Sequence, residues 1–185
     1  VRPSVLVGLR ERGIQRFSLD ASKPTVLIFG GGTGAAWLNQ QVIELIPTLG
    51  QKANILHVTG KGKRHESSLE NPFYHAYEFL DEDMKEAYAV SDVVVCRAGM
   101  GSLTELSALS KPAIVIAIPH SLQEANAQMV MQASVTLDQS QTTPDRLCST
   151  ILELLDDEPR CQALGKQLHQ VLRTDGAQEL VDLLK

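Results

Sequence analysis

The chain has 185 residues, 43% of them hydrophobic, and a formal net charge of -5. This length suits one α/β domain around a single hydrophobic core. No apolar run approaches the roughly 20 residues of a membrane-spanning helix, and the negative charge argues against nucleic acid as the main partner. The three cysteines have neither metal-site nor CxxC spacing, which indicates reduced thiols and a cytoplasmic location.

Residues 1–24 are predicted to be a connector. They carry mixed charges and one short helical segment at 9–16, followed by the turn-like sequence SLDASKP. The chain begins VRPSVL, with no initiator methionine and no signal sequence, which we interpret as a start inside a longer protein. The folded domain is expected to occupy residues 25–185.

Strand and helix patterns alternate along the rest of the chain. Strands are predicted at 25–29, 53–58, 75–80, 91–96, 113–118 and 134–137. Helices are predicted at 37–49, after residue 80, from residue 102, and at 123–132, 144–155, 160–173 and 178–184. Such βαβ units have right-handed crossovers, so we predict an α/β fold with a Rossmann-like, doubly wound parallel sheet of about six strands.

The segment SDVVVCRAGMGSLTE, residues 91–105, is the most informative. Its unbroken apolar run predicts a central strand covered on both faces. After Arg97, Gly99 and Gly101 let the backbone turn and approach a ligand closely, and Ser102 opens a helix. A helix N-terminus at the carboxyl end of a central strand favours an anionic ligand.

A second glycine turn, GGGTGA, follows the first strand and fits the dinucleotide pattern GxGxx[GA]. The second strand, however, ends in HVTGK, without the acidic residue that binds the ribose of NAD. NAD is therefore disfavoured, whereas NADP bound by Lys61 or Arg64 stays open. A pyrophosphate, a sugar, or no ligand at all would also suit this turn.

Polar residues near these turns have two interpretations each. Glu105 lies one helical turn after the glycines, where it can reach a ribose diol, but Ser102 and Glu105 also have the spacing of a capping box. His120, Gln123 and Asn126 can line a sugar pocket or belong to an ordinary loop and helix start. No spacing indicates a metal site or a hydrolytic triad.

Five segments, GGGTGAAWLNQ, TGKGK, FLDEDM, SDVVVCRAGMGSLTE and IPH…QEANA, together resemble the C-terminal half of the MurG family of glycosyltransferases (family 28). These bacterial enzymes transfer N-acetylglucosamine from UDP-N-acetylglucosamine to a lipid-linked muramyl pentapeptide. The resemblance implies the C-terminal half of a GT-B fold, in which two Rossmann-like domains face each other. The start VRPSVL resembles the hinge between them.

The resemblance implies which residues bind the UDP. Glu105 would bond the ribose hydroxyls, Leu80 would present backbone groups to the uracil, and Met84 would pack nearby. Arg2 of the hinge would lie close to the nucleotide. The diphosphate would lie against the two glycine turns, whose residues are Gly30, Gly31, Gly32, Thr33, Gly34, Arg97, Gly99, Met100, Gly101 and Ser102.

The sugar would be read by Gln123, with His120 and Asn126. The chain departs from the family in having Gly32 in place of a serine, which removes one hydroxyl contact to phosphate, and in having a shorter segment between His120 and Gln123. The resemblance therefore implies the nucleotide more specifically than the sugar. It implies no metal and no cofactor, because helix N-termini and side chains balance the diphosphate charge.

In the family, the acceptor site and the catalytic base belong to the N-terminal half, which this chain lacks. No residue here is therefore expected to be catalytic, and the chain is expected to bind UDP or its sugar weakly and to transfer nothing. The lipid-linked acceptor would be reached through the missing half, at the inner face of the cell membrane. Two alternatives stay open: a donor-binding subunit of a split sugar transferase, and an NADP-binding or other ligand-binding domain.

Overall fold

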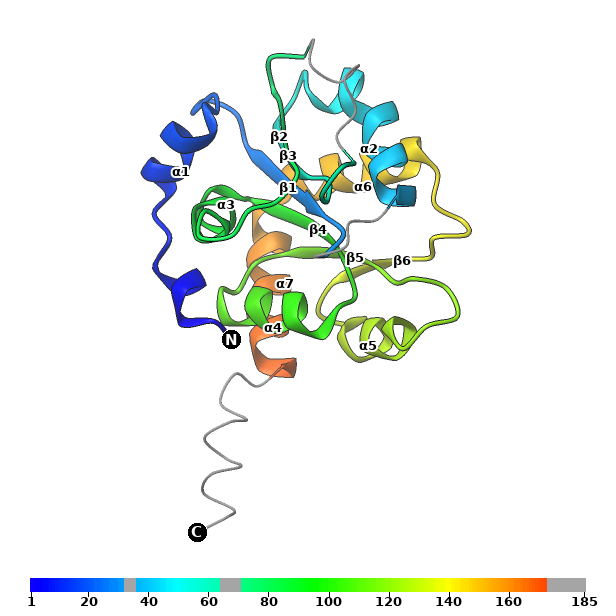
Figure 1. The fold of residues 1–185 in the computed structure, drawn as a ribbon. Helices are drawn as coiled ribbons and strands as arrows, with labels where there is room; N and C mark the ends of the chain where they lie inside the picture. The colour runs from blue at the N-terminus through cyan, green and yellow to red at the C-terminus, as the bar shows by residue number, and fades with distance from the viewer. Residues whose placement is uncertain (32–35, 64–70, 173–185) are drawn as a thin grey trace.

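The computed structural model describes residues 1–31, 36–63 and 71–172. It contains one six-stranded parallel sheet of order β3-β2-β1-β4-β5-β6 (Figure 1). The strands are β1 (Thr25–Phe29), β2 (Asn54–Val58), β3 (Tyr74–Tyr77), β4 (Val93–Arg97), β5 (Ala113–Ile116) and β6 (Val135–Leu137). The predicted doubly wound parallel sheet is confirmed.

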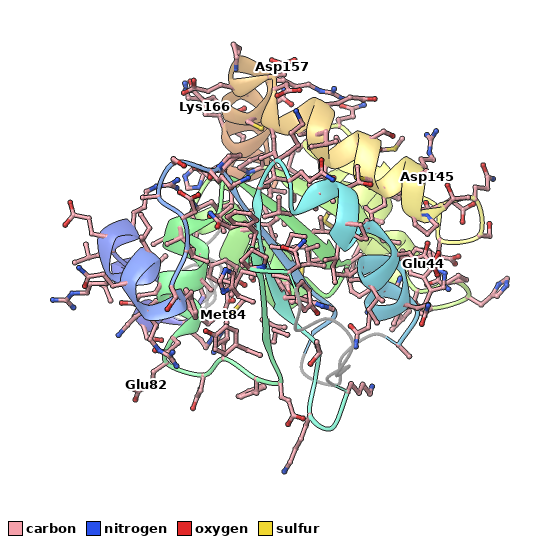
Figure 2. All side chains as sticks on the ribbon, turned by 90° about the horizontal axis from the view of Figure 1, so that it is seen from above. Glu44, Glu82, Met84, Asp145, Asp157 and Lys166 are labelled. Atoms are coloured by element: carbon pink, nitrogen blue, oxygen red, sulfur yellow. The ribbon has the colours of Figure 1, made fainter. Side chains whose placement is uncertain are left out.

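Helices cover both faces of the sheet. They are η1 (Pro3–Val7), α1 (Arg10–Phe17), α2 (Ala36–Leu49), α3 (Met84–Val90), α4 (Met100–Ala108), α5 (Gln123–Val130), α6 (Pro144–Leu155) and α7 (Glu158–Val171). In Figure 2 the layer of α1 and α3 lies on one side, near Met84, and α2 and α6 lie on the other, near Glu44 and Asp145. Among the described residues, no helix has the length and hydrophobicity to cross a bilayer.

The central strands alternate between the two hydrophobic clusters. In β4, Val94 and Cys96 pack on the side of α3 and α4, while Val93 and Val95 pack on the side of α2 and α6. Because each face meets a layer of helices, every position of this strand is apolar or buried. Burial of both faces of β4 therefore explains the unbroken apolar run in the sequence.

Residues 1–24 form η1 and α1, and both pack against α3. Val5 and Phe17 belong to the same hydrophobic cluster as α3 and α4. Arg10 pairs with Asp92 at 2.9 Å, which ties α1 to the start of β4. The segment is thus folded onto the domain, and its role as a connector to a preceding domain stays a prediction.

Two predicted strands are shorter than expected at their carboxyl ends. The strand predicted at 75–80 corresponds to β3, and Tyr77 is the last residue of β3 that is in register with β2. The strand predicted at 113–118 ends at Ile116, where its pairing with β4 and β6 also ends. At this point the Arg97 guanidinium donates hydrogen bonds to the carbonyl oxygens of Ile116 and Ala117.

Helix starts also differ from the prediction. The helix predicted from residue 102 begins at Met100, because Gly99 already serves as its N-cap. The helix predicted at 160–173 begins at Glu158, where the Asp157 side chain accepts a hydrogen bond from the Arg160 N–H. The helix predicted at 178–184 lies outside the described residues.

The packing of α7 gives a test of the fold. Gly165 lies where α7 meets the carbonyl of Ser110, and a Cβ there would overlap that backbone oxygen. We expect Gly165→Ala to lower the free energy of unfolding by about 1–3 kcal/mol, measured by urea and thermal denaturation. Gly101→Ala is the matched control, because open space surrounds that helical glycine. Equal stability of the two variants would contradict this packing.

Candidate functional site

The turn after β4 forms an open helix N-terminus. Gly99 is the N-cap of α4, with φ −74° and ψ 130°, and no side chain caps this end of the helix. A Cβ at Gly99 or Gly101 would meet nothing within 4 Å. The space beside both glycines is therefore open to a ligand. The backbone conformation of Gly99 is one that any residue can adopt, so the structure of the turn alone does not require glycine there. Met100 is 38% exposed and Ser102 is half-buried beside it.

The first glycine turn leaves the sheet beside the second. Phe29, the last residue of β1, pairs in register with Cys96 of β4. Gly30 and Gly31 follow, and Gly31 has φ +88° and open space around it. The strand order reverses between β1 and β4, and ligands of open α/β sheets bind in the crevice at such a point. The predicted residues Gly32, Thr33 and Gly34 lie outside the described residues.

The carboxylate of Glu105 is buried, and the residue is 7% exposed. Arg2 donates from Nε to Oε1 at 2.7 Å and from Nη2 to Oε2 at 3.3 Å. This bond and the charge of Glu105 raise the pKa of Arg2. The capping box with Ser102 is not formed, because the Glu105 carboxylate accepts hydrogen bonds from Arg2 instead. The structure therefore brings together two predicted site residues that are 103 residues apart in the sequence.

Tyr88 is the residue of this cluster that sequence reasoning missed. It lies on α3, is 1% exposed, and donates its hydroxyl to Glu105 Oε2 at 2.9 Å. Burial, followed by the nearby charge of Glu105, raises its pKa well above the ordinary value, so the phenol stays protonated. In the sequence it occupies an apolar position of a helix, and no local signal distinguishes it from core.

Arg97 is a buried cation at the end of β4. It is 5% exposed, and its Nη1 donates to the carbonyl oxygens of Ile116 and Ala117, both at 3.2 Å. Its guanidinium carbon lies 5.3 Å from the centre of the Trp37 ring. Nε is buried without a partner, and burial lowers the pKa.

No carboxylate within the described part of the chain forms an ion pair with Arg97. A buried charge normally has a counter-charge, because removing it from water costs several kcal/mol. The site at the end of β4 therefore combines an open helix N-terminus with an uncompensated cation. Both features favour an anion.

Leu80 and Met84 both belong to the hydrophobic cluster on the side of α3 and α4, and they are 6% and 7% exposed. The Leu80 N–H and C=O take no part in the hydrogen bonds among the described residues. One donor and one acceptor are thus offered at the start of the segment that leads to α3. Phe79, which sequence reasoning also missed, is 62% exposed next to them.

The predicted sugar-reading residues lie at the start of α5. His120 is exposed, has φ +56°, and donates its N–H to Glu124 Oε1 at 3.1 Å. Gln123 accepts from the Ile118 N–H through Oε1 at 3.4 Å. Asn126 donates to the carbonyl of Ala98 at 2.9 Å, which ties α5 to the glycine turn after β4. Of the three side chains, that of Asn126 is thus next to the open helix N-terminus.

The end of β2 carries no carboxylate for a ribose. Val58 is followed by buried Thr59, then by Gly60 with φ +93° and exposed Lys61. Arg64, the other residue expected for NADP, lies outside the described residues. Among those that are described, no group of three His, Cys, Asp or Glu side chains is arranged to hold a metal ion.

A cavity of about 540 Å³ lies at the opposite, amino edge of the sheet. Its cations already have partners within the chain: Arg10 bonds Asp92, Lys23 bonds the carbonyl of Gln51, and Lys111 bonds the carbonyl of Ser91. Of these three cations, only Arg10 is paired with a carboxylate of a described residue.

Residues 25–180 match the family model of the glycosyltransferase family 28 C-terminal domain. Relatives described as UDP-N-acetylglucosamine--N-acetylmuramyl-(pentapeptide) pyrophosphoryl-undecaprenol N-acetylglucosamine transferase include one from Lachnospira eligens, 30% identical over 85% of this chain and 46% of its own length. Those from Myxococcus xanthus and Corynebacterium efficiens are 34% and 36% identical, over 86% and 78% of this chain and 44% and 41% of their own lengths. The chain spans about half the length of the curated relatives it matches.

Solved structures agree with the fold. The crystal structure of Acinetobacter baumannii MurG covers 97% of this chain with a TM-score of 0.75 and 26% identity, over 54% of its own length. The kitacinnamycin glycosyltransferase covers 86% with a TM-score of 0.67 over 43% of its own length, and at 21% identity it supports the fold alone. The predicted likeness to the C-terminal half of GT-B glycosyltransferases is confirmed.

Trp37, the single tryptophan, gives a test of the anion site. Because the Arg97 guanidinium lies against its ring, we expect inorganic pyrophosphate to change the intrinsic fluorescence saturably. The Arg97→Met variant should lose this response while keeping its secondary structure by circular dichroism. Potassium chloride at matched ionic strength is the control. An unchanged response in the variant would place the anion elsewhere.

Proposed function

The chain belongs to the glycosyltransferase family 28 C-terminal domain family, and from this premise we propose that it is the donor-binding half of a sugar transferase. The donor is UDP-N-acetylglucosamine, and the acceptor is a lipid-linked precursor of peptidoglycan. The observation that carries the proposal is the buried Glu105 carboxylate, held one helical turn behind the open N-terminus of α4. A ribose diol and a diphosphate need these two features next to each other.

The UDP would lie across the crevice between β1 and β4. The N–H and C=O of Leu80, which form no hydrogen bond with another described residue, match the donor and acceptor edge of uracil, and exposed Phe79 offers its ring to the base. Glu105 accepts hydrogen bonds from the ribose hydroxyls. The glycine turns and the N-terminus of α4 receive the diphosphate, with Arg97 behind them.

This arrangement suits the departure of UDP during sugar transfer. Negative charge grows on the diphosphate as the bond to the sugar breaks. Fixed N–H groups at a helix N-terminus and a buried guanidinium stabilise that charge without a metal ion. Gln123, His120 and Asn126 would contact the sugar, because they start the helix that is tied to the same turn.

The acceptor and the catalytic base would come from the half that this chain lacks. The curated relatives are about twice as long as this chain, and we assign no catalytic base within it. The chain alone is expected to bind donor weakly and to transfer nothing. Its partner is a preceding domain or a separate subunit, in a cytoplasmic enzyme at the inner face of the membrane.

Calorimetric titration with UDP, UDP-N-acetylglucosamine and NADP tests this assignment. We expect binding of the two uridine ligands, and a loss of about ten-fold or more in Glu105→Gln, because a charge-assisted hydrogen bond contributes about 1.5–3 kcal/mol. Glu153→Ala, on the exposed face of α6, is the matched control. Preference for NADP, or undiminished UDP affinity in Glu105→Gln, would contradict the proposal.

A further inference from the structure

Tyr88 is a core residue with one polar atom. Its ring packs edge-on against Phe29 of β1, with ring centres 6.1 Å apart and planes at 74°. It is also among the largest fully buried side chains. A phenylalanine would supply the same apolar packing, and a buried hydroxyl without a partner is costly. The hydroxyl of Tyr88 meets Glu105 Oε2 at 2.9 Å.

We propose that Tyr88 is the positioning residue that holds the Glu105 carboxylate in place for the ribose. This inference rests on the proposed function, since it concerns the same nucleotide site. Tyr88 touches no substrate in this arrangement. It acts by fixing the side chain that does, so that Glu105 loses little rotamer freedom when the nucleotide binds.

The two partners of Glu105 differ in how firmly they are held. The Arg2 side chain is 53% exposed and precedes the short helix η1. Water reaches the Arg2 guanidinium, so Arg2 can release a hydrogen bond to Glu105 and pair the freed N–H with solvent. Tyr88, in contrast, is fixed by the core on all sides. Tyr88 is therefore the partner that remains when the site is occupied.

Counting hydrogen bonds leads to the same conclusion. A carboxylate accepts about four hydrogen bonds. Arg2 and Tyr88 together donate three to Glu105, and a ribose diol donates two more. At least one existing bond must break when the diol binds. The 3.3 Å bond from Arg2 Nη2 is the longest of the three, whereas releasing Tyr88 would leave a buried hydroxyl unpaired.

The test compares UDP with 2′,3′-dideoxy-UDP, which lacks both ribose hydroxyls. In the unaltered chain we expect UDP to bind at least about ten-fold more tightly. Tyr88→Phe should weaken UDP binding by about three- to ten-fold and leave the dideoxy nucleotide unaffected. Tyr77→Phe is the matched control, because that tyrosine packs against the same core cluster. We expect it to change neither affinity.

Three outcomes separate the inference from its alternatives. Equal weakening of both nucleotides in Tyr88→Phe would show a purely structural role and overturn it. So would a further loss of UDP affinity when Tyr88→Phe is added to Glu105→Gln, because Tyr88 is argued to act only through that carboxylate. A chain that never distinguishes the two nucleotides would instead overturn the ribose contact in the proposed function.

A crystal of the unaltered chain soaked with UDP tests the inference without a variant. We expect Tyr88 to keep its hydrogen bond to Glu105 and Arg2 to lose at least one of its two. A complex in which Tyr88 turns away while Arg2 keeps both bonds would overturn the proposal, whatever the stability of Tyr88→Phe.

Discussion

The pairing of β1 with β4 is the constraint on which the site depends. These strands are far apart in sequence but adjacent in the sheet, in register from Val26 with Val93 to Phe29 with Cys96. The strand order reverses between them, so the helices that follow them leave toward opposite faces. A crevice at the carboxyl edge follows from this divergence. Both glycine turns open into it because each directly follows one of the two strands.

Two buried charged side chains near this crevice differ in whether an opposite charge lies beside them. Glu105 has three hydrogen bonds from Arg2 and Tyr88, so its burial is compensated before any ligand arrives. Among the described residues, Arg97 has only neutral carbonyl partners and the Trp37 ring, and its Nε has no hydrogen-bond partner. A compensated carboxylate is ready to accept a neutral diol, whereas an uncompensated guanidinium favours a negative ligand. A nucleoside diphosphate carries both groups.

The sequence predicts the sheet well because its signals are local. The unbroken apolar runs of β4 and β5 follow from helices on both faces, and the glycines mark the turns. Strand ends were harder, because β5 ends where its pairing with β4 and β6 ends, and this register is not local in the sequence. The site was predicted from motifs and resemblance. Tyr88 was missed because its partner Glu105 lies on another helix, and burial makes it look like core.

Arg2 joins the first residues of the chain to the proposed nucleotide site through Glu105. The Arg2 side chain is 53% exposed, whereas that of Glu105 is 9% exposed, so water screens this ion pair from one side only. A preceding domain that pulled Arg2 away could change donor affinity through this pair by no more than the free energy of the pair itself, since coupling cannot exceed the interaction it removes. An effect of such a domain on donor binding that exceeded this limit would have to act through contacts other than the pair of Arg2 with Glu105.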